Sequence, residues 1–595
     1  DDDGDDDDDD DDADTGGRKR GAKGKHTRKG KGKGKRAKRR TKRGKRVPAT
    51  QAAIAPLRAL HKRLTRADAA VQALFGRLDG LAGAELQVTK ARIDLLLPAA
   101  SQPFGGLRDG TVSLSRRLTD GSRSLSVRVE PVLAETGWGP ARFELQAAPG
   151  GHLAKATLKL AGGGWARALS TIGQAASVQR DADLSLDLTL KAATPAEVAL
   201  TGKVTVAHVG VNWWRIAPRP IDDFSFGGQV DLTATTEPAQ MQLRLSSLDL
   251  GGAKLDVTLE ALALKKRPEV RLLIQAPLQD CGKVAKAIPA SLIPTIGAIA
   301  AEGQIAGEFD LRIPLDNPYK GKLKASLNDD ACTVTQFGEL DVTALARPFK
   351  RPVNESGTIL EDQLIGPQSD AWVALNKLPP WVPYAMIATE DAAFFHHKGV
   401  RLGLTARAIK MCLDFGRFVY GGSTITQQLV KNIFLTRDKY LGRKFEELLI
   451  VWHMERNLFD AETVKAAKDD EQPIKDRILE IYINGIEFAP HLYGIQRSAK
   501  LYFDKDAVDL TPLEAAFLAA NKPCPKCGHK RFEQKKWTPW WQTRMVGIMN
   551  KMRTNGIITE AQFVAEAPYV PRFVGWPQAV RPGPTGGGDI GGDEE

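Results

Sequence analysis

The sequence predicts a multidomain protein in which an antiparallel β-rich domain is followed by a mainly α-helical domain. From about Glu85 to Leu345, apolar residues recur at every second position between glycine-rich turns. This period is typical of antiparallel strands with one solvated and one apolar face. Further along the chain, the apolar residues recur at three- and four-residue steps, which indicates helices.

A chain of 595 residues is expected to form two to four domains. The changes of pattern divide this chain into six segments. The predicted segments are a charged tail over 1–50, a helix over 51–84, the β-rich domain over 85–345, a linker over 346–363, the helical domain over 364–580 and a glycine-rich acidic tail over 581–595.

Half of the net charge of +12 arises from the first segment, where residues 1–14 hold twelve Asp and residues 18–46 hold eighteen Lys or Arg, so that the two runs together contribute +6. Blocks of like charge repel one another and bury nothing, so we expect disorder there. The basic run lacks interleaved aromatic residues. A solvated tail or a tether to an anionic membrane is therefore expected, and nucleic acid is not an expected partner.

Two cysteines are close together, in the sequence Cys524-Pro-Lys-Cys527. This is half of a four-cysteine zinc site, and no second pair completes it. His529 follows two residues on, so a zinc knuckle is the alternative, but we expect a local disulfide or two free thiols and predict no metal site. No apolar stretch of about 18 residues is present, and the chain begins at Asp1, so an anchor upstream would not be visible.

Polar residues that can carry chemistry gather in five clusters between residues 390 and 505. Listed in order, they are Glu390-Asp391 with Phe394, His397 and Gly399; Gly421-Gly422-Ser423-Thr424-Ile425-Thr426-Gln427-Gln428 with Lys431-Asn432; Arg443-Lys444 with Glu447; Lys475 with Glu480, Tyr482 and Asn484; and Gly494-Ile495 with Tyr502-Phe503 and Lys505.

Glu390 and Glu447 are two carboxylates in separate clusters, which suits a sugar-transfer site where two carboxylates take different roles. Lys431, Arg443 and Lys444, beside a Gly-Gly-Ser-Thr turn with free backbone donors, could stabilise a departing pyrophosphate. Because phosphates leave readily, no strong general acid is needed.

The five clusters in order resemble the peptidoglycan glycosyltransferase family, from about Leu364 to Ile558. The resemblance implies a lysozyme-like helical fold that polymerises lipid II into β-1,4 glycan and releases undecaprenyl pyrophosphate. It implies that Glu390 is the catalytic base and Glu447 the second carboxylate. The substrate-binding residues that it implies are Asp391, His397, Gly422, Ser423, Thr424, Gln427, Gln428, Lys431, Asn432, Arg443 and Lys444.

No Ser-x-x-Lys, Ser-Asp-Asn and Lys-Thr-Gly set follows, so the monofunctional type is expected, with a separate transpeptidase as a possible partner. We expect no required cofactor, although Mg²⁺ could assist the reaction. The implied location is the periplasmic face of a bacterial inner membrane. The amphipathic stretch from Val400 to Tyr420 is either a membrane-contacting flap or a buried helix pair.

The sequence departs from the family pattern at three places. Ala392-Ala393 replace a usual Arg, Asp504 replaces a usual Gly, and His491-Leu492 replace a usual Arg-Gly. These departures remove positive charge near the substrate phosphates. They motivate an alternative, a β-rich lipid-handling or scaffold envelope protein with an inactive glycosyltransferase module.

One segment of the β-rich domain supports that alternative. Ile288-Pro-Ala-Ser-Leu-Ile-Pro, leading into Gly303-Gln-Ile-Ala-Gly-Glu-Phe-Asp-Leu, resembles the AsmA-like family of envelope proteins. In that family, long curved sheets can hold lipid in an apolar groove. A β-rich spacer without a ligand remains the other interpretation.

Overall fold

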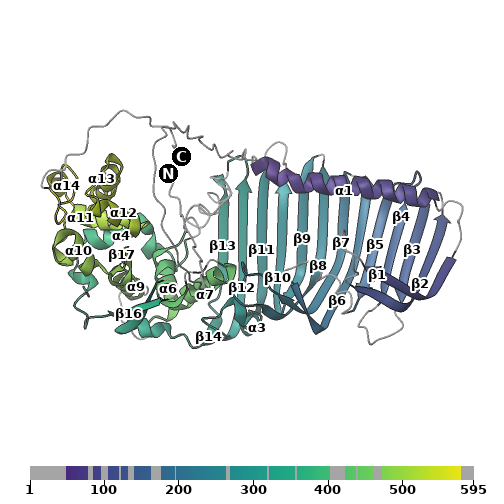
Figure 1. Ribbon diagram of the computed structural model, residues 1–595, viewed down its shortest axis with the longest axis horizontal. Helices are drawn as coiled ribbons and strands as arrows, with labels where there is room; N and C mark the ends of the chain where they lie inside the picture. The colour runs from purple at the N-terminus through teal and green to yellow at the C-terminus, as the bar shows by residue number, and fades with distance from the viewer. Residues whose placement is uncertain are drawn as a thin grey trace, which may run out of the picture. The chain divides into compact units, whose positions relative to one another are not determined.

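The computed structural model (Figure 1) describes residues 49–577 apart from 78–84, 96–104, 120–121, 131–139, 163–175, 195, 237, 263–267, 318–319, 356–357, 402–421, 437, 439 and 460–471. Both predicted tails beyond these limits, and nearly all of the predicted flap over 400–420, lie outside the described residues.

A sheet of fourteen strands forms the first part of the fold. Strands β1 to β13 pair in sequence order, and β14 pairs with β12. Every one of these pairs is antiparallel. The strands are β1 (Glu85–Leu95), β2 (Gly105–Thr119), β3 (Ser122–Glu130), β4 (Ala141–Ala147), β5 (Leu153–Ala161), β6 (Ala176–Thr194), β7 (Glu197–Val211), β8 (Ile221–Thr236), β9 (Ala239–Leu250), β10 (Ala253–Leu262), β11 (Glu269–Asp280), β12 (Ile299–Pro314), β13 (Lys322–Asn328) and β14 (Cys332–Phe337).

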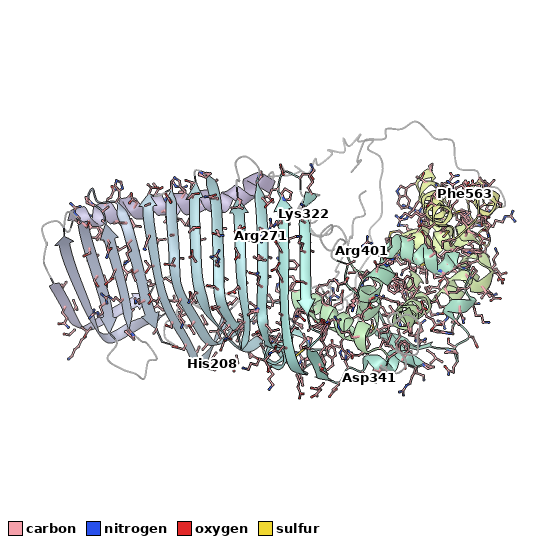
Figure 2. The ribbon with its side chains drawn as sticks, turned by 180° about the vertical axis from the view of Figure 1, so that it is seen from behind. His208, Arg271, Lys322, Asp341, Arg401 and Phe563 are labelled. Carbon is pink, nitrogen blue, oxygen red and sulfur yellow. A yellow bond between two sulfur atoms is a disulfide. The ribbon has the colours of Figure 1, made fainter. Side chains whose placement is uncertain are left out.

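Leucines align across this sheet because the strand registers match. A continuous row of directly paired residues crosses eight strands, from β6 to β13: Leu190, Leu200, Leu232, Leu243, Leu259, Leu272, Leu311 and Leu323. Side chains alternate between the two faces of a strand, so this row defines an apolar face. Most of its leucines are half-buried, and side chains stand on both faces of the sheet (Figure 2).

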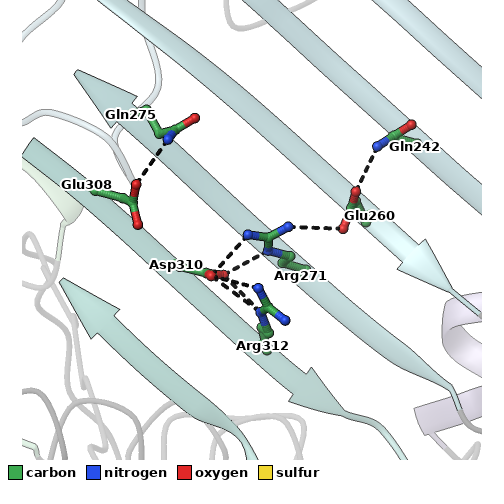
Figure 3. Close-up of polar contacts among 7 residues, drawn as sticks. All are labelled: Gln242, Glu260, Arg271, Gln275, Glu308, Asp310 and Arg312. Atoms are coloured by element: carbon green, nitrogen blue, oxygen red, sulfur yellow. Dashed lines mark hydrogen bonds and ion pairs between the residues drawn. The ribbon is translucent and has the colours of Figure 1, made fainter. Parts of the chain in front are cut away.

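The opposite face is polar and satisfies its own charges. Arg271 donates to Asp310 at 2.9 Å and also lies 3.7 Å from Glu260, to which Gln242 donates. Arg312 reaches the same Asp310 carboxylate at 3.1 Å (Figure 3). The two arginines hold the pKa of Asp310 at about 2, against the opposing effect of burial. This network pairs polar positions of β9 to β12 with one another.

Helix α1 (Ala49–Arg77) crosses the strands near one end of them (Figure 1). Leu60 and Leu64 pack with a cluster that includes Val198 and Ala234. Further along the helix, Val71 and Phe75 pack against strands β3 to β5. Its apolar positions therefore cover part of the apolar face. Of the helix predicted over 51–84, residues 51–77 are helical, and 78–84 lie outside the described residues.

A disulfide joins Cys281 to Cys332 across 51 residues of sequence. Cys281 begins helix α3 (Cys281–Lys286), and Cys332 begins β14. Sequence spacing gave no reason to pair these two residues. The bond fixes the end of β11 to β14, the strand that pairs with the first residues of β12.

The segment predicted as a linker, 346–363, forms a hairpin of β15 (Phe349–Glu355) and β16 (Thr358–Ile365). Arg351 donates to Gln363 at 3.1 Å, and Gln363 donates to the carbonyl of Asn484 at 3.2 Å. The side chains of Arg351 and Gln363 are both buried. The polar residues that suggested a linker are used in this buried network.

The second part of the fold is helical, and the predicted order of a β-rich and a helical region is confirmed. Its helices are α4 (Trp381–Glu390), α6 (Ile425–Phe434), α7 (Leu441–Asn457), α9 (Gln472–Gly485), α10 (Ile495–Phe503), α11 (Pro512–Asn521), α12 (Pro525–Glu533), α13 (Pro539–Thr554) and α14 (Glu560–Ala565), with the short hairpin β17 (Glu487–Ala489) and β18 (Leu492–Tyr493). No helix among the described residues is both long enough and apolar enough to span a bilayer.

Candidate active site

Glu390 is the last residue of α4 and is half-buried. Gln428 of α6 donates from Nε2 to Glu390 Oε2 at 2.6 Å. The Tyr482 hydroxyl of α9 donates to Gln428 Oε1 at 3.1 Å. Burial raises the pKa of Tyr482 well above its usual value, so this hydroxyl keeps its proton and remains a donor. The Gln428 amide is thereby oriented toward the carboxylate.

Asp391, the next residue, fixes the position of α4 relative to α6. Its Oδ2 atom lies 2.8 Å from His397 Nε2 and accepts a hydrogen bond from the backbone N–H of Ile425. The side chain is buried, and its Oδ1 atom has no hydrogen-bond partner among the described residues. Asp391 and His397 therefore support the turn before α6.

The turn before α6 is built by its own side chains. Thr424 caps the helix, and its hydroxyl also donates to the carbonyl of Gly399 at 2.6 Å. The side-chain oxygen of Gln427 accepts a hydrogen bond from the backbone N–H of Thr424, which completes a capping box. Gly399 has a φ of +76°, and an added Cβ would lie 2.3 Å from Val451. Thr424 and Gln427 are thus engaged in holding the turn itself.

Three charged residues of α7 are paired with one another, and one of them, Lys444, contacts Ser423 of this turn. Lys444 Nζ lies 2.5 Å from Glu447 Oε1 and 3.1 Å from Ser423 Oγ. Arg443 Nη1 donates to Glu447 Oε2 at 3.2 Å, and its buried Nε has no partner among the described residues. Glu447 is buried. The arrangement presents two cations, held by one carboxylate, beside the start of α6.

The adjacent acid, Glu446, faces a different part of the molecule. Its Oε1 atom accepts the backbone N–H groups of Thr295 and Ile296 at 2.6 and 3.0 Å, and the Thr295 hydroxyl lies 3.2 Å from Oε2. Burial raises the pKa of Glu446. The Arg-Lys-x-x-Glu spacing therefore selects the acid beside the cations, while its neighbour joins α7 to the β-rich region.

Replacing Glu446 by Ala should destabilise the protein by about 2–6 kcal/mol, because the N–H groups of Thr295 and Ile296 lose their acceptor at about 1–3 kcal/mol each. Gln is expected to be nearly neutral, because its single carbonyl oxygen can take over the position of Oε1. Urea unfolding of both variants measures the difference. Equal losses for Ala and Gln would show that the charge, and not the acceptor, matters.

The structure connects both carboxylates to the start of α6. Glu390 is bonded to Gln428 in the first turn of the helix, and Glu447 is connected through Lys444 to Ser423 in the turn before it. Gly422 is half-buried in the same turn, and Lys431 and Asn432 are exposed further along α6. The turn and the first part of α6 therefore bring the sequence-predicted site residues into one neighbourhood.

Lys522 is a buried cation of this neighbourhood that the sequence analysis missed. Its ammonium donates to the carbonyl of Glu487 at 3.0 Å and lies 5.6 Å from the ring centre of Tyr482. Burial lowers the pKa of Lys522 to about 7, while the charge of Glu390 opposes the shift. The available signal was a lysine directly after the apolar helix α11.

We expect the pH dependence of activity to reflect the charge state of Lys522. A lysine with a pKa of about 7 is charged below that pH and neutral above it, so attraction for an anionic substrate falls as pH rises through 7. We expect kcat/KM, which reports free-enzyme groups, to decline above pH 7. Lys522→Arg should retain activity to higher pH, and Lys522→Met should be low throughout. An unchanged profile in Lys522→Met would refute this role.

Two of the family departures lie where the backbone is left-handed. Asp504 caps α10 with a φ of 53°, and His491 has a φ of 60° between β17 and β18. Glycine adopts this conformation without strain, which gives a backbone reason for its usual presence at position 504. The neighbouring Lys505 pairs with Glu514 at 2.9 Å, so its charge is used within the fold.

Cys524 and Cys527 form a disulfide at the start of α12, which agrees with one of the two expected states. No group of three or more His, Cys, Asp or Glu side chains suited to a metal ion occurs in the described part of the chain.

The family model described as Transglycosylase matches residues 357–553. The biosynthetic peptidoglycan transglycosylase of Paraburkholderia xenovorans is 35% identical over 200 residues, which cover 31% of this chain and 75% of that protein. The protein of the same name from Cupriavidus metallidurans is 38% identical over 165 residues, or 28% of this chain and 64% of that protein.

Penicillin-binding protein 1A of Aquifex aeolicus is 36% identical over 204 residues, which are 33% of this chain and 25% of that protein. The chain therefore spans a quarter of that relative but three quarters of the Paraburkholderia protein. All these matches, together with the geometry around Glu390 and Glu447, show that the chain belongs to the transglycosylase family.

Proposed function

We propose that the chain is a peptidoglycan glycosyltransferase that polymerises lipid II into β-1,4 glycan strands and releases undecaprenyl pyrophosphate. The observation that carries this proposal is the pair of carboxylates, Glu390 and Glu447, both connected to the start of α6, the latter beside Lys444 and Arg443. Glu390 accepts a hydrogen bond from the Gln428 amide, whereas Glu447 is bound to two cations, Arg443 and Lys444. Two environments of this kind suit two chemical roles.

In the proposed reaction, Glu390 takes the proton from the 4-hydroxyl of the acceptor N-acetylglucosamine. The freed oxygen attacks the anomeric carbon of the N-acetylmuramic acid that ends the growing strand. The bond from that carbon to the pyrophosphate breaks with inversion, and the electron pair leaves on the phosphate oxygen. Gln428, oriented by Tyr482, holds the Glu390 carboxylate in place for the proton transfer.

The departing pyrophosphate needs positive charge and hydrogen-bond donors. Arg443 and Lys444 supply the charge, and the unpartnered Nε of Arg443 can donate to a phosphate oxygen. Glu447 keeps both cations in fixed positions, so they need not reorganise as charge develops. Lys431 and Lys522 add to the positive potential near Glu390.

We further propose that no resident cofactor is required and that Mg²⁺, where it assists, binds with the substrate phosphates. Polymerisation measured across a series of EDTA concentrations tests this statement. Retained activity at an excess of EDTA agrees with it, and complete loss that Mg²⁺ restores contradicts it.

The proposed place of action is the periplasmic face of a bacterial inner membrane, where a lipid-linked substrate and the nascent glycan meet the enzyme. A separate transpeptidase is the proposed partner, because cross-linking needs chemistry other than glycosyl transfer. Co-purification of a penicillin-binding transpeptidase after mild cross-linking would support this partnership, and its repeated absence would count against it.

The deciding experiment is incubation of the full chain with purified, labelled lipid II in several detergents. Formation of long glycan that a muramidase digests to disaccharide supports the proposal. Shortening of a preformed glycan without any polymer synthesis would indicate a glycosidase instead. A folded protein that does neither would favour the alternative of an inactive module.

The apolar face of the sheet favours a second, compatible role for the β-rich region in lipid handling. Its row of paired leucines crosses eight strands and is mostly half-buried. Mass spectrometry of lipids that co-purify with the chain tests this role. Arg271 and Asp310 on the polar face provide control positions, because changes there should not alter the lipid content.

A further inference from the structure

Four large hydrophobic side chains are exposed where the β-rich region meets α7. Trp213 and Trp214, in the loop 212–220 between β7 and β8, retain 47% and 67% of their surface. Leu441 and Phe445, in the first turns of α7, retain 66% and 39%. Single exposed apolar residues are ordinary, but a group of four that includes two tryptophans marks an interaction site. These four residues are called the junction patch.

Backbone contacts hold the two halves of the patch together. The N–H groups of Leu441 and Gly442 donate to the carbonyls of Arg215 and Ile216, each at 2.8 Å. These bonds satisfy donors that the start of a helix leaves unpaired. An added Cβ at Gly442 would lie 2.9 Å from the Ile216 carbonyl oxygen, so the loop and helix approach as closely as glycine allows.

The loop that carries the tryptophans has a defined shape. The N–H groups of Ile216 and Ala217 donate to the carbonyl of Trp213 at 2.8 and 3.2 Å. Ala217 and Ile221 are buried and anchor the loop. His208, near the end of β7 that leads into it, is labelled in Figure 2. The indole rings are therefore displayed on an ordered turn.

Positive charge accompanies the patch. The Arg215 guanidinium lies 5.1 Å from the ring centre of Trp214, and the Lys444 side chain retains 41% of its surface. Leu441 and Phe445 are four residues apart and so share one face of α7. Indole rings beside cations suit the interface of a bilayer, where one end of the ring is apolar and the other is solvated.

We propose that the junction patch inserts into the interface of a phospholipid bilayer and seats the first turn of α7 at the level of the lipid phosphates. The inference rests on the proposed function, since a lipid-linked pyrophosphate would lie at that level. Arg443 and Lys444 belong to the same turn as Leu441. The patch would therefore place these cations at the depth where the substrate presents its phosphates.

The first test measures binding of the full chain to vesicles of phosphatidylethanolamine and phosphatidylglycerol by flotation. Replacing Trp213 and Trp214 together by Ser should weaken binding about tenfold or more, because two indole rings no longer leave water. Trp540→Ser is the matched control. Trp540 is also exposed, at 49%, and Arg544 lies 5.2 Å from its ring centre, but it belongs to α13.

The second test uses vesicles with brominated acyl chains, which quench inserted tryptophans. The double change of Trp213 and Trp214 to Phe should preserve binding and reduce the quenched fraction of the emission. Trp540→Phe should reduce the unquenched fraction instead. This pair keeps the rings apolar, so the result does not depend on whether the Ser variants fold.

Equal binding of the wild-type chain and the Ser variant, or quenching that is unchanged in the Phe variant, would overturn the proposal and leave the patch as a contact surface for another protein. Polymerisation in detergent separates this failure from failure of the proposed function. There the Ser variant should retain wild-type activity, because no bilayer is needed to present the substrate.

Discussion

Replacing Glu390 by Gln should reduce polymerisation of lipid II by about 10²–10⁴-fold, which is the usual contribution of a general base. The amide cannot take the proton of the acceptor hydroxyl. Its oxygen can still accept the hydrogen bond from Gln428, so the local structure should persist. Initial rates with labelled lipid II in detergent measure the loss.

Folding of this variant serves as the internal check, and its free energy of unfolding should stay within about 0.5 kcal/mol of wild type. Glu560→Gln is a matched control, because Glu560 is an exposed acid of the same domain paired with Arg553. Activity within a few-fold of wild type in Glu390→Gln would remove this residue from the chemistry.

Replacing Glu447 by Gln should lower both activity and stability. The change leaves Arg443 and Lys444 without their shared carboxylate, so we expect a loss of about 3 kcal/mol, near the lower limit for a broken buried ion pair because Lys444 stays partly exposed. Activity should fall by about 10²-fold or more, since the cations lose their fixed positions. Unfolding and polymerisation assays on one preparation give both values.

The double variant Glu447→Gln with Lys444→Met separates the two effects. Removing the unpaired ammonium should recover part of the stability, whereas activity should fall further because a cation facing the pyrophosphate is lost. Recovery of activity together with stability would mean that Glu447 acts only through folding, and its proposed role at the reacting groups would be wrong.

The order of domains was predictable because each region follows a single hydrophobic period. Leu184, Leu186, Leu188 and Leu190 alternate with polar residues, and they lie on β6 of the sheet. The register that aligns Leu190 with leucines of seven other strands was not predictable, because it depends on bulges such as the one between Val206 and Val209. The hairpin over 349–365 was missed because its polar residues are paired with Asn484, more than a hundred positions away.

The residues predicted for the candidate site stand in local motifs, whereas long-range contacts explain what those motifs could not indicate. Thr424 and Gln427 stood out in sequence as substrate-binding residues, yet both side chains are engaged in the capping box of α6. Lys522 belongs to no motif that the sequence analysis recognised, and only the fold brings it near Tyr482. Sequence spacing pointed to Glu447, but it could not show that Glu446 accepts bonds from Thr295 and Ile296.

The bond between Glu446 and the residues after η3 (Ala290–Leu292) has a consequence for how this chain can be rearranged. The family model matches residues 357–553, so Thr295 lies outside the matched portion. Grafting that portion alone onto another scaffold would strip a buried acid of its amide donors and uncover the start of α7. The β-rich region therefore helps to hold the start of α7 in place, and a transplant would succeed only if position 446 were redesigned or the segment around Thr295 travelled with it.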